Sequence, residues 1–362
     1  MKKIILSAVF VFCSIILLNR CAVNNSSVMV PIDQPALEKL SDYNFFDGKM
    51  AELNGNEGVL PYDLITPLFT DYAEKSRFVW MPDGTTATYN KDEVLDLPVG
   101  AVLIKNFYYN NDQTDLSKGR RIIETRLLVH RKEKWDALTY VWNDEQTEAF
   151  LEVAGDIKKV DWINKQGKTM SVNYVVPNKN QCKGCHDYKG ELVPIGPKVR
   201  NLNHSFNYID GAANQLEKWA SVGYLSGFDA NQTHGKIAKW DDPNAAALAD
   251  RAMAYLEVNC GHCHRTDGPA GVSGLNLLTS ETNSLHKGIC KSPVSAGSGS
   301  GGNSYDIVPG HPDQSILVYR MEINDPGTRM PEVGRSIVHE EGVALIREWI
   351  SAMEGECPES IK

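Results

Sequence analysis

Two C-x-x-C-H motifs constrain this chain more than any other feature of its sequence. They are Cys182-Lys183-Gly184-Cys185-His186 and Cys260-Gly261-His262-Cys263-His264. In such a motif two thiols are spaced to form thioether bonds with the vinyl groups of a haem, and the following histidine is placed to bind the iron. The sequence therefore predicts two covalently bound c-type haems. The attachment residues would be Cys182, Cys185, Cys260 and Cys263, and the proximal iron ligands His186 and His264.

Zinc binding and a redox disulfide are the alternatives for each C-x-x-C pair. Zinc ribbons separate their two pairs by about 15 to 20 residues, whereas Cys185 and Cys260 are 75 positions apart. Each pair is also followed directly by a histidine, which neither a zinc ribbon nor a thioredoxin-like site requires. The pattern favours haem, and structural zinc is the remaining alternative.

The first 21 residues have the pattern of an export signal. Met1-Lys2-Lys3 precedes an apolar run from Ile4 to Leu18 that is too short to span a bilayer. Cys21 stands where a bacterial lipoprotein carries its acylated cysteine, although small residues usually precede such a cysteine and Asn19 and Arg20 do so here. We expect residues 1–21 to be a lipoprotein-type signal peptide and residues 22–31 a tether, with plain cleavage near residue 21 as the alternative. The mature protein would then be periplasmic or on the outer face, anchored to a membrane by lipid.

Composition limits the remaining possibilities. The chain has 362 residues, enough for two or three domains, and 42% hydrophobic with 23% charged residues is typical of a globular protein. A formal net charge of -9 argues against a nucleic-acid surface, which needs clustered lysine and arginine.

Residues 32–176 read as a β-rich module. Arg121 to His130 alternates, with Ile123, Thr125, Leu127 and Val129 on one face and Glu124, Arg126 and His130 on the other, as in a half-buried strand. Further β-branched or aromatic runs are 102–109, 138–142, 149–153 and 169–176, separated by turn residues. These runs predict a β-sandwich or barrel-like module.

The rest of the chain is predicted to be α-rich, so that the whole is a multidomain α+β protein. Residues 177–240 form the first haem segment, with a helix expected over 211–223. Residues 241–356 have the layout of a small class I cytochrome c domain: a helix opened by Asp242 and Pro243 that runs into Cys260, a Met-bearing loop, and a closing helix with Ile346, Trp349, Ile350 and Met353 on one stripe. Residues 296–302, rich in Gly and Ser, are expected to be a flexible surface loop.

Met330 is the predicted sixth ligand of the second haem. It lies in a loop just ahead of the closing helix, whereas the alternative, Met321, lies in a sequence typical of a packed helix. Backbone carbonyls near Pro269 and Pro194 are expected to accept hydrogen bonds from His264 and His186, because such contacts orient a metal-bound imidazole. Arg200 and Arg320 are candidates to bind haem propionates, with ordinary surface salt bridges as the alternative.

The first haem has no obvious sixth ligand, because no methionine occurs between His186 and Trp240. His204, His234 and a donated Met321 are candidates, and an open sixth position is the alternative. We therefore expect the two haems to differ in ligation, and the His264/Met330 haem to have the higher potential, because a thioether ligand raises it.

Two cysteines remain in the predicted mature chain. An exported protein folds in an oxidising compartment, so Cys290 and Cys357 are expected to form a disulfide that ties the Gly-rich region to the end of the closing helix. The alternative is that Cys290 is a small buried residue.

The chain resembles a family of largely uncharacterised bacterial di-haem c-type cytochromes in which a β-rich module precedes the haem region. The resemblance covers most of the predicted mature chain and implies electron transfer in the cell envelope with no settled substrate. It rests on Tyr62-Asp63-Leu64 with Thr66-Pro67-Leu68-Phe69, Glu124 to Leu128, Trp142-Asn143 with Gln146-Thr147, Pro177 to Cys182, Gly196-Pro197-Lys198 with Arg200 to Asn203, and the tail from Met330-Pro331 to Trp349.

Three functions fit this pattern. The first is electron transfer to a redox partner protein in the envelope, with the β-rich module as a docking surface. The second is a di-haem peroxidase-like enzyme in which the first haem has an open distal side, and the third is a haem-bearing module that recognises a partner or glycan. A polar group in the β-rich module is either a binding site or a solvated sheet face: Glu124, Arg126, Asn143, Asp144, Glu145 and Gln146.

Overall fold

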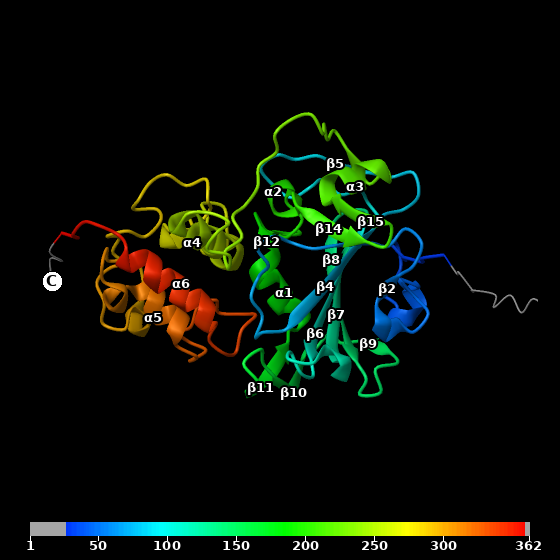
Figure 1. Ribbon diagram of the computed structural model, residues 1–362, viewed down its shortest axis with the longest axis horizontal. Coiled ribbons are helices and arrows are strands. Elements are labelled where there is room, and N and C mark those ends of the chain that lie inside the picture. The colour runs from blue at the N-terminus through cyan, green and yellow to red at the C-terminus, as the bar shows by residue number, and fades with distance from the viewer. Residues whose placement is uncertain (1–26, 359–362) are drawn as a thin grey trace, which may run out of the picture.

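A six-stranded antiparallel sheet is the central element of the structure, a computed structural model that describes residues 27–358 (Figure 1). The strands lie in the order β3-β4-β6-β7-β8-β9, so neighbours in space follow one another along the chain apart from short β5. The sheet is built from β3 (Leu60–Tyr62), β4 (Glu74–Trp80), β6 (Val102–Asn110), β7 (Arg120–His130), β8 (Trp135–Trp142) and β9 (Ala149–Leu151). With the helices described below, the fold is α+β.

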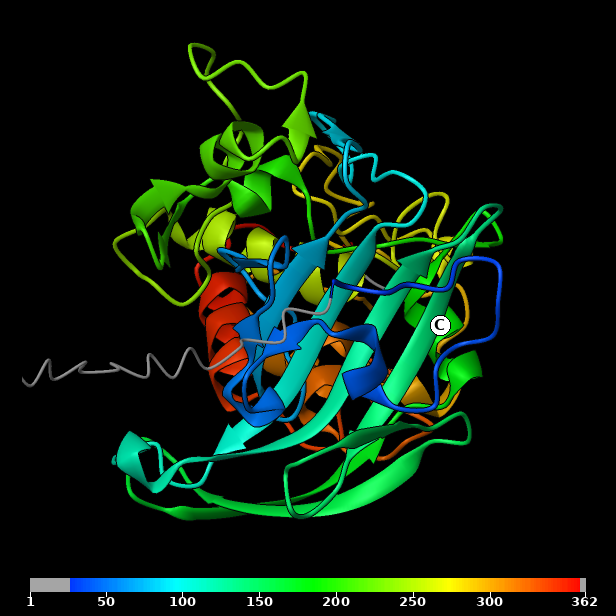
Figure 2. The same cartoon turned by 90° about the vertical axis from the view of Figure 1, so that its right-hand side faces the viewer.

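The predicted strands are present, but they form one open sheet with a long hairpin beside it, neither a β-sandwich nor a barrel. One face of the sheet is covered by the N-terminal segment, which contributes Leu40, Tyr43 and Phe45 to a core with Phe78 and Leu127 (Figure 2). The opposite face packs against residues of the first haem segment and against the long hairpin, and the C-terminal helices lie on that side of the molecule (Figure 2). Both faces of the sheet are therefore buried. The segments that cover them are mostly loops and helices, so no second sheet completes a sandwich.

A β-bulge changes which side chains of β7 share a face. The register between β6 and β7 shifts at Phe107 and Tyr108, and Ile123 is the unpaired extra residue. A bulge of this kind puts two residues opposite one, so Ile122 packs with Leu127, while Ile123 packs with Phe107 on the other face. The strict alternation predicted for Ile123 is therefore wrong. Glu124, predicted on a half-exposed face, is fully buried.

The remaining strands form small two-stranded sheets around the main one. The longest is the hairpin β10 (Asp156–Ile163) with β11 (Thr169–Val176). The others are β1 (Phe46–Asp47) with β2 (Asn54–Gly55), β12 (Asp187–Tyr188) with β13 (Glu191–Leu192), β14 (Ser205–Tyr208) with β15 (Gly211–Asn214), and β16 (Leu225–Ser226) parallel to β5 (Ala87–Thr88).

The helices are short and lie mostly after residue 178. They are α1 (Lys179–His186), α2 (Val199–Leu202), α3 (Gln215–Ser221), α4 (Leu248–Leu256), α5 (Ile316–Glu322) and α6 (Glu340–Ser351). Short 3-10 helices are η1 (Leu40–Tyr43), η2 (Met50–Glu52), η3 (Leu116–Lys118), η5 (Gly271–Ser273), η6 (Gly297–Ser300) and η7 (Pro312–Gln314), and η4 (Glu257–Gly261) is a π-helical turn.

The first haem segment shares its hydrophobic core with the sheet. Trp219 on α3 is fully buried and packs edge-on against Tyr62 of β3, with ring centroids 5.7 Å apart. Leu202 and Leu216 join the same cluster. The helix predicted over 211–223 is only partly correct, because residues 211–214 form β15 and the helix begins at Gln215, capped by the Asn214 side chain. This segment mixes short strands with short helices and has no separate core.

The C-terminal part packs α4, α5 and α6 around Leu256, Val318 and Ile346. The closing helix is present with Trp349 and Ile350 buried, but it ends at Ser351, so Met353 packs on the core from beyond the helix. The entering helix begins at Leu248, so the predicted start at Asp242 is wrong. Asp242 instead accepts a hydrogen bond from the Asn244 N–H at 2.9 Å and stabilises a turn, which is the local alternative that aspartate offers to a helix.

Cys290 and Cys357 form the predicted disulfide, with Cα atoms 5.2 Å apart. It closes a segment of 67 residues that contains the Gly-rich stretch. That stretch lies mostly at the surface, as predicted, but part of it forms an ordered turn. Residues 297–300 form η6, and Gly299 is buried so close to Arg320 that a Cβ there would lie 2.7 Å from a guanidinium nitrogen. A larger residue at position 299 would therefore displace the Arg320 guanidinium.

The predicted signal peptide and Cys21 lie outside the described residues. Of the predicted tether, residues 27–31 lie on the protein: Val28 and Val30 pack against the sheet core, and Arg131 donates a 2.7 Å hydrogen bond to the Pro31 carbonyl. The tether prediction is therefore wrong for residues 27–31, because Val28 and Val30 pack against the sheet core. Between residues 27 and 358 no helix is long and apolar enough to cross a membrane.

Replacing Trp219 with Ala tests the shared core. We expect the free energy of unfolding to fall by about 3 to 5 kcal/mol, the usual cost of deleting a buried indole. Because Trp219 packs on the sheet, the loss should appear in the unfolding of the sheet as well as in that of the first haem segment. The measurement is denaturant unfolding followed by far-UV circular dichroism and tryptophan fluorescence.

Ile209→Ala is the control for this variant, because Ile209 is fully exposed in the same segment. It should change the free energy of unfolding by less than about 0.5 kcal/mol. A Trp219→Ala protein whose sheet unfolds at the wild-type denaturant concentration would contradict the shared core.

Candidate haem site

The first C-x-x-C-H motif lies on α1, which presents its reactive residues on one face. Asn178 caps the helix: its side chain accepts a hydrogen bond from the Gln181 N–H, and the Gln181 side chain accepts one from the Asn178 N–H, both at 2.9 Å. Cys182, Cys185 and His186 follow at spacings of three and four residues, which place side chains together on a helix. The local sequence thus points both thiols and the imidazole into the same space.

The second motif begins at the end of α4, where the π-helical turn η4 leads into Cys260. Two contacts hold this turn, one to the sheet module and one to the first haem segment. The Asn259 side chain accepts a hydrogen bond from the Phe69 N–H at 2.9 Å, and Glu257 pairs with Arg200. A π-helical turn often marks a functional position in a helix, and here it carries the first cysteine of the motif.

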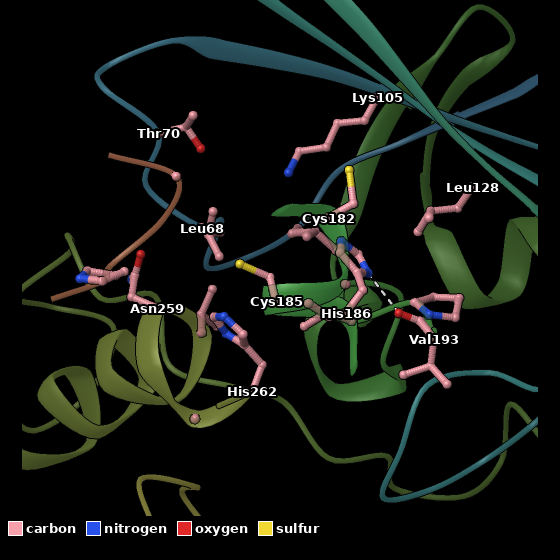
Figure 3. Close-up of a pocket in the computed structure, with 18 of the residues that line it drawn as sticks. Leu68, Thr70, Lys105, Leu128, Cys182, Cys185, His186, Val193, Asn259 and His262 are labelled. Carbon is pink, nitrogen blue, oxygen red and sulfur yellow. Dashed lines mark hydrogen bonds between the residues drawn. The ribbon is translucent and has the colours of Figure 1, made fainter. Parts of the chain in front are cut away.

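A cavity of about 600 Å³ lies between the two motifs and the sheet, and we call it the central cavity. Its volume is within the range of small-molecule and cofactor sites. Figure 3 shows the sulfur atoms of Cys182 and Cys185 and the ring of His186 facing it. Other lining residues are Leu68, Arg77, Lys105, Arg126, Leu128, Arg200, Tyr255, Cys260, His262, Met321, Met330, Arg335 and His339.

The imidazole of His186 is oriented for binding a metal. Its Nδ1 lies 2.7 Å from the carbonyl oxygen of Val193. A carbonyl can only accept, so Nδ1 carries the proton and Nε2 keeps a free lone pair. The predicted acceptor near Pro194 is therefore confirmed, and it is the carbonyl of the preceding residue, Val193.

His264 has the same tautomer, held by a different partner. Its Nδ1 lies 3.1 Å from the Ser273 hydroxyl oxygen, and that hydroxyl donates its one proton to the Ala270 carbonyl at 2.7 Å. The hydroxyl must therefore accept from Nδ1, which leaves Nε2 free. The predicted acceptor near Pro269 is wrong, because the 3-10 helix η5 brings Ser273 back to the ring.

Burial adjusts the protonation of the motif residues. It lowers the pKa of His186 and of His264 to about 4, so both imidazoles are neutral at pH 7. Burial also raises the pKa of Cys260 and Cys263 to about 12, which keeps these thiols protonated. A neutral imidazole is the form that binds iron, whereas zinc needs thiolates.

The donor set fits haem better than a directly bound ion. Within residues 27–358, no three His, Cys, Asp or Glu side chains come close enough together to hold a metal ion. Structural zinc takes four such ligands, whereas haem iron needs only one or two axial side chains from the protein. Two thiols and one correctly oriented imidazole per motif match that requirement.

The predicted methionines both face the central cavity. Met330 is half-buried, and its carbonyl accepts a 3.1 Å hydrogen bond from Arg335 Nε. Arg335 is buried and was not predicted; it donates to four further acceptors along the same loop, the carbonyls of Arg320, Ile323 and Ile337 and the Asn324 side chain. Met321 is buried in the core of the C-terminal part.

The two predicted propionate arginines differ. Arg200 lines the central cavity, although its guanidinium also contacts Glu257 and Thr279. Arg320 does not line it, because its Nε donates to the Thr328 carbonyl at 2.9 Å and its end packs on Gly299. Arg200 therefore forms the salt bridge given as its alternative, although it also lines the cavity. Arg320 stabilises the loop before Met330.

Neither predicted histidine ligand of the first haem reaches the central cavity. His204 contacts the carbonyl oxygens of Ser205 and Asp63, and His234 contacts the Tyr89 hydroxyl and the Asp229 carbonyl. Their ring nitrogens are therefore already occupied, and both predictions are wrong. Met321 remains in the cavity wall.

Lys105 and His262 line the central cavity and were not predicted. Each had a signal in the sequence: Lys105 interrupts an apolar strand, and His262 is a second histidine inside the second motif. The Nδ1 of His262 is buried and makes no well-formed hydrogen bond within residues 27–358. Only the fold shows that these two side chains face the same space as His186.

The predicted polar group of the β-rich module does not form one site. Glu124 and Arg126 form an ion pair on the cavity face of the sheet, with Nε and Oε2 2.9 Å apart. Asn143 and Gln146 hold the β8–β9 turn, whereas exposed Asp144 pairs with Arg121. The solvated-turn interpretation is correct for the residues after 142.

No protein-family model, curated protein or solved structure matches the chain.

The half-buried His339 predicts a loss of stability in acid. Its ring stacks on Phe69, with centroids 4.0 Å apart, and burial lowers its pKa to about 4. An unfolded histidine has a pKa near 6.5, so the unfolded state binds a proton first as the pH falls. The contribution of His339 to the free energy of unfolding is therefore complete above pH 6.5 and decreases by roughly 3 kcal/mol by pH 4.

The variant His339→Gln tests this dependence. Between pH 6.5 and 4 its free energy of unfolding should fall less steeply than that of the wild type, as measured by urea unfolding at a series of pH values. His311→Gln is the matched control, because His311 is exposed, and it should keep the wild-type slope. Equal slopes for all three proteins would contradict a lowered pKa for His339.

Proposed function

We propose that this protein is a di-haem c-type cytochrome that transfers electrons in the bacterial cell envelope. When bound, each haem would supply a one-electron ferric/ferrous couple. The chain would attach the first through Cys182 and Cys185 and the second through Cys260 and Cys263. His186 and His264 would bind the irons, and the free Nε2 of each ring supports that role.

The observation that carries the proposal is the direct contact between the two motifs. The Sγ of Cys263 lies 3.5 Å from the carbonyl oxygen of Gly184, so the attachment segments touch although they are far apart in sequence. The chain following each motif is joined as well: the Arg265 guanidinium lies 4.8 Å from the ring centre of Tyr188, and Lys189 pairs with Asp267 at 3.5 Å. This proximity suits electron transfer between two centres.

Met330 is the proposed second axial ligand at the second haem. Its loop is fixed from two directions, by Arg335 and by Asp71, whose carboxylate accepts hydrogen bonds from the Ser336 and Ile337 N–H groups at 2.6 and 3.1 Å. A loop held in this way can present a thioether without reorganising. We propose His264/Met330 ligation there, and a first haem of different ligation and lower potential.

We also propose that the protein is exported and anchored by lipid at Cys21. The lysines and apolar run at the start of the chain support export, and the disulfide between Cys290 and Cys357 supports an oxidising compartment. The proposed partner is a redox protein of the envelope, and the acidic net charge gives no support to nucleic-acid binding.

The proposal predicts two thioether-bound haems per chain. Protein expressed with its own leader in a host that matures c-type cytochromes should give a pyridine haemochrome count near two, and its haem stain should survive denaturation. Cys182→Ala with Cys185→Ala should reduce the count to one, because only the second motif then remains. A wild-type protein with no haem and bound zinc would contradict the proposal.

Met330→Ala tests the ligation of the second haem. We expect the long-wavelength charge-transfer band of a thioether–iron bond to disappear from the oxidised spectrum, and one of the two reduction potentials to fall, because a methionine ligand raises the potential.

Met321→Ala is the matched control, since Met321 also lines the central cavity but belongs to the packed core. It should keep the charge-transfer band and lose about 2 to 5 kcal/mol of unfolding free energy. If the band survives in Met330→Ala and is lost in Met321→Ala, the ligand is Met321.

A further inference from the structure

A row of three cations crosses the sheet beneath the central cavity. Arg77 on β4 lies opposite Lys105 on β6, and Lys105 lies opposite Arg126 on β7. All three side chains line the cavity. Like charges placed directly opposite in a sheet destabilise it, so the row needs compensation.

The two outer cations are compensated and the middle one is not. Arg77 pairs with Asp63 at 2.6 Å, and Arg126 pairs with Glu124 through Nε and Oε2 at 2.9 Å. Lys105 has no hydrogen bond or ion pair with any residue in the described range 27–358, and its amine lies 4.8 Å from the ring centre of Phe107. The amine is therefore available to something in the cavity.

The surroundings of Lys105 favour its neutral form. Burial, with Arg77, Lys75 and Arg126 nearby, holds the pKa of its amine well below the usual value. A neutral amine has a lone pair and is a nitrogen ligand. Figure 3 shows the amine pointing toward the space between the sulfurs of Cys182 and Cys185, into which the ring of His186 also points.

We propose that Lys105 would be the second protein ligand of the first haem iron, together with His186. This inference rests on the proposed function. It names a ligand for the first haem, whose own segment contains no methionine. The position suits the role: β6 lies inside the sheet, between β4 and β7, so the ligand is carried by a rigid element. The first haem would then have two nitrogen ligands, and the second a nitrogen and a thioether.

His262 is the rival ligand in the same cavity. It belongs to the second motif, and Figure 3 shows its ring on the far side of Cys185 from Lys105. The carboxylates of a haem are a different rival, because Lys105 could pair with one of them through charge alone. The experiment below distinguishes iron binding by Lys105 from iron binding by His262 and from an ion pair between Lys105 and a haem carboxylate.

The experiment uses the full-length, haem-loaded protein and four variants. Lys105→Arg places a permanently charged side chain at this position, which could still pair with a carboxylate but cannot bind iron, because a guanidinium does not deprotonate in proteins. Lys105→Met replaces the amine with a thioether. His262→Ala removes the rival, and Lys75→Arg is the matched control, a half-buried lysine on β4 that does not line the cavity. Haem count is measured first, then the oxidised electron paramagnetic resonance spectrum, cyanide binding and the two potentials.

We expect both wild-type haems to be six-coordinate and low-spin. In Lys105→Arg one of the two should become high-spin and bind cyanide, while Met330 ligation at the other is unchanged. Lys105→Met should restore the low-spin state, double the intensity of the thioether charge-transfer band and raise the lower potential. His262→Ala and Lys75→Arg should keep two low-spin haems.

Three results would overturn the inference while leaving the proposed function intact, each with a haem count near two. A high-spin first haem in the wild type would mean that its sixth position is open. A high-spin haem in His262→Ala would make His262 the ligand. A low-spin Lys105→Arg protein with only a shifted potential would make Lys105 a charge partner of a carboxylate. A wild-type protein without haem would instead refute the proposed function itself.

Discussion

The apolar packing of the first haem segment on the sheet is the constraint on which the site depends. Residues from 199 to 225 have no core of their own and bury Leu202, Leu216 and Trp219 against sheet residues such as Val79 and Leu103. Each such side chain contributes about 1.5 to 3 kcal/mol when it leaves water. This packing fixes the segment on one face of the sheet, where α1 contacts β8, and the same face forms the floor of the central cavity.

Electrostatics make that floor unusual. A buried sheet face is normally apolar, but here Glu124 is fully buried, paired with Arg126 and hydrogen-bonded by the Tyr174 hydroxyl at 2.5 Å. Removing a partner from such a pair leaves an uncompensated charge, which costs about 3 to 5 kcal/mol. Other parts of the cavity wall, Leu68 and Leu128 among them, are apolar. A cavity with a charged floor and apolar walls suits a ligand that has an apolar body and a few polar groups.

Strands and the closing helix could be predicted because their signals are local. The apolar run that became β6 and the stripe from Ile346 to Ile350 in α6 need only a period of two or of 3.6 residues. Predictions failed where distant residues decide. The bulge at Ile123 depends on the partner strand, and the Gly-rich stretch is ordered where it packs on α5. The Asp242 side chain accepts a backbone hydrogen bond in a turn, which is as available to it as capping a helix.

For the site, the sequence by itself determined the chemistry available at each motif: two thiols and a histidine at fixed spacing, with the lone methionine loop ahead of the closing helix. Covalent spacing is a property of the chain, so it can be read without a fold. Which side chains face those motifs was decided only by the tertiary structure. Lys105 meets His186 across a cavity because strand register and the packing of α1 bring them there, and His204 is directed elsewhere by carbonyls on its own side of the segment. Contacts between residues this far apart in sequence follow from the summed packing of the whole core, and no local pattern encodes them.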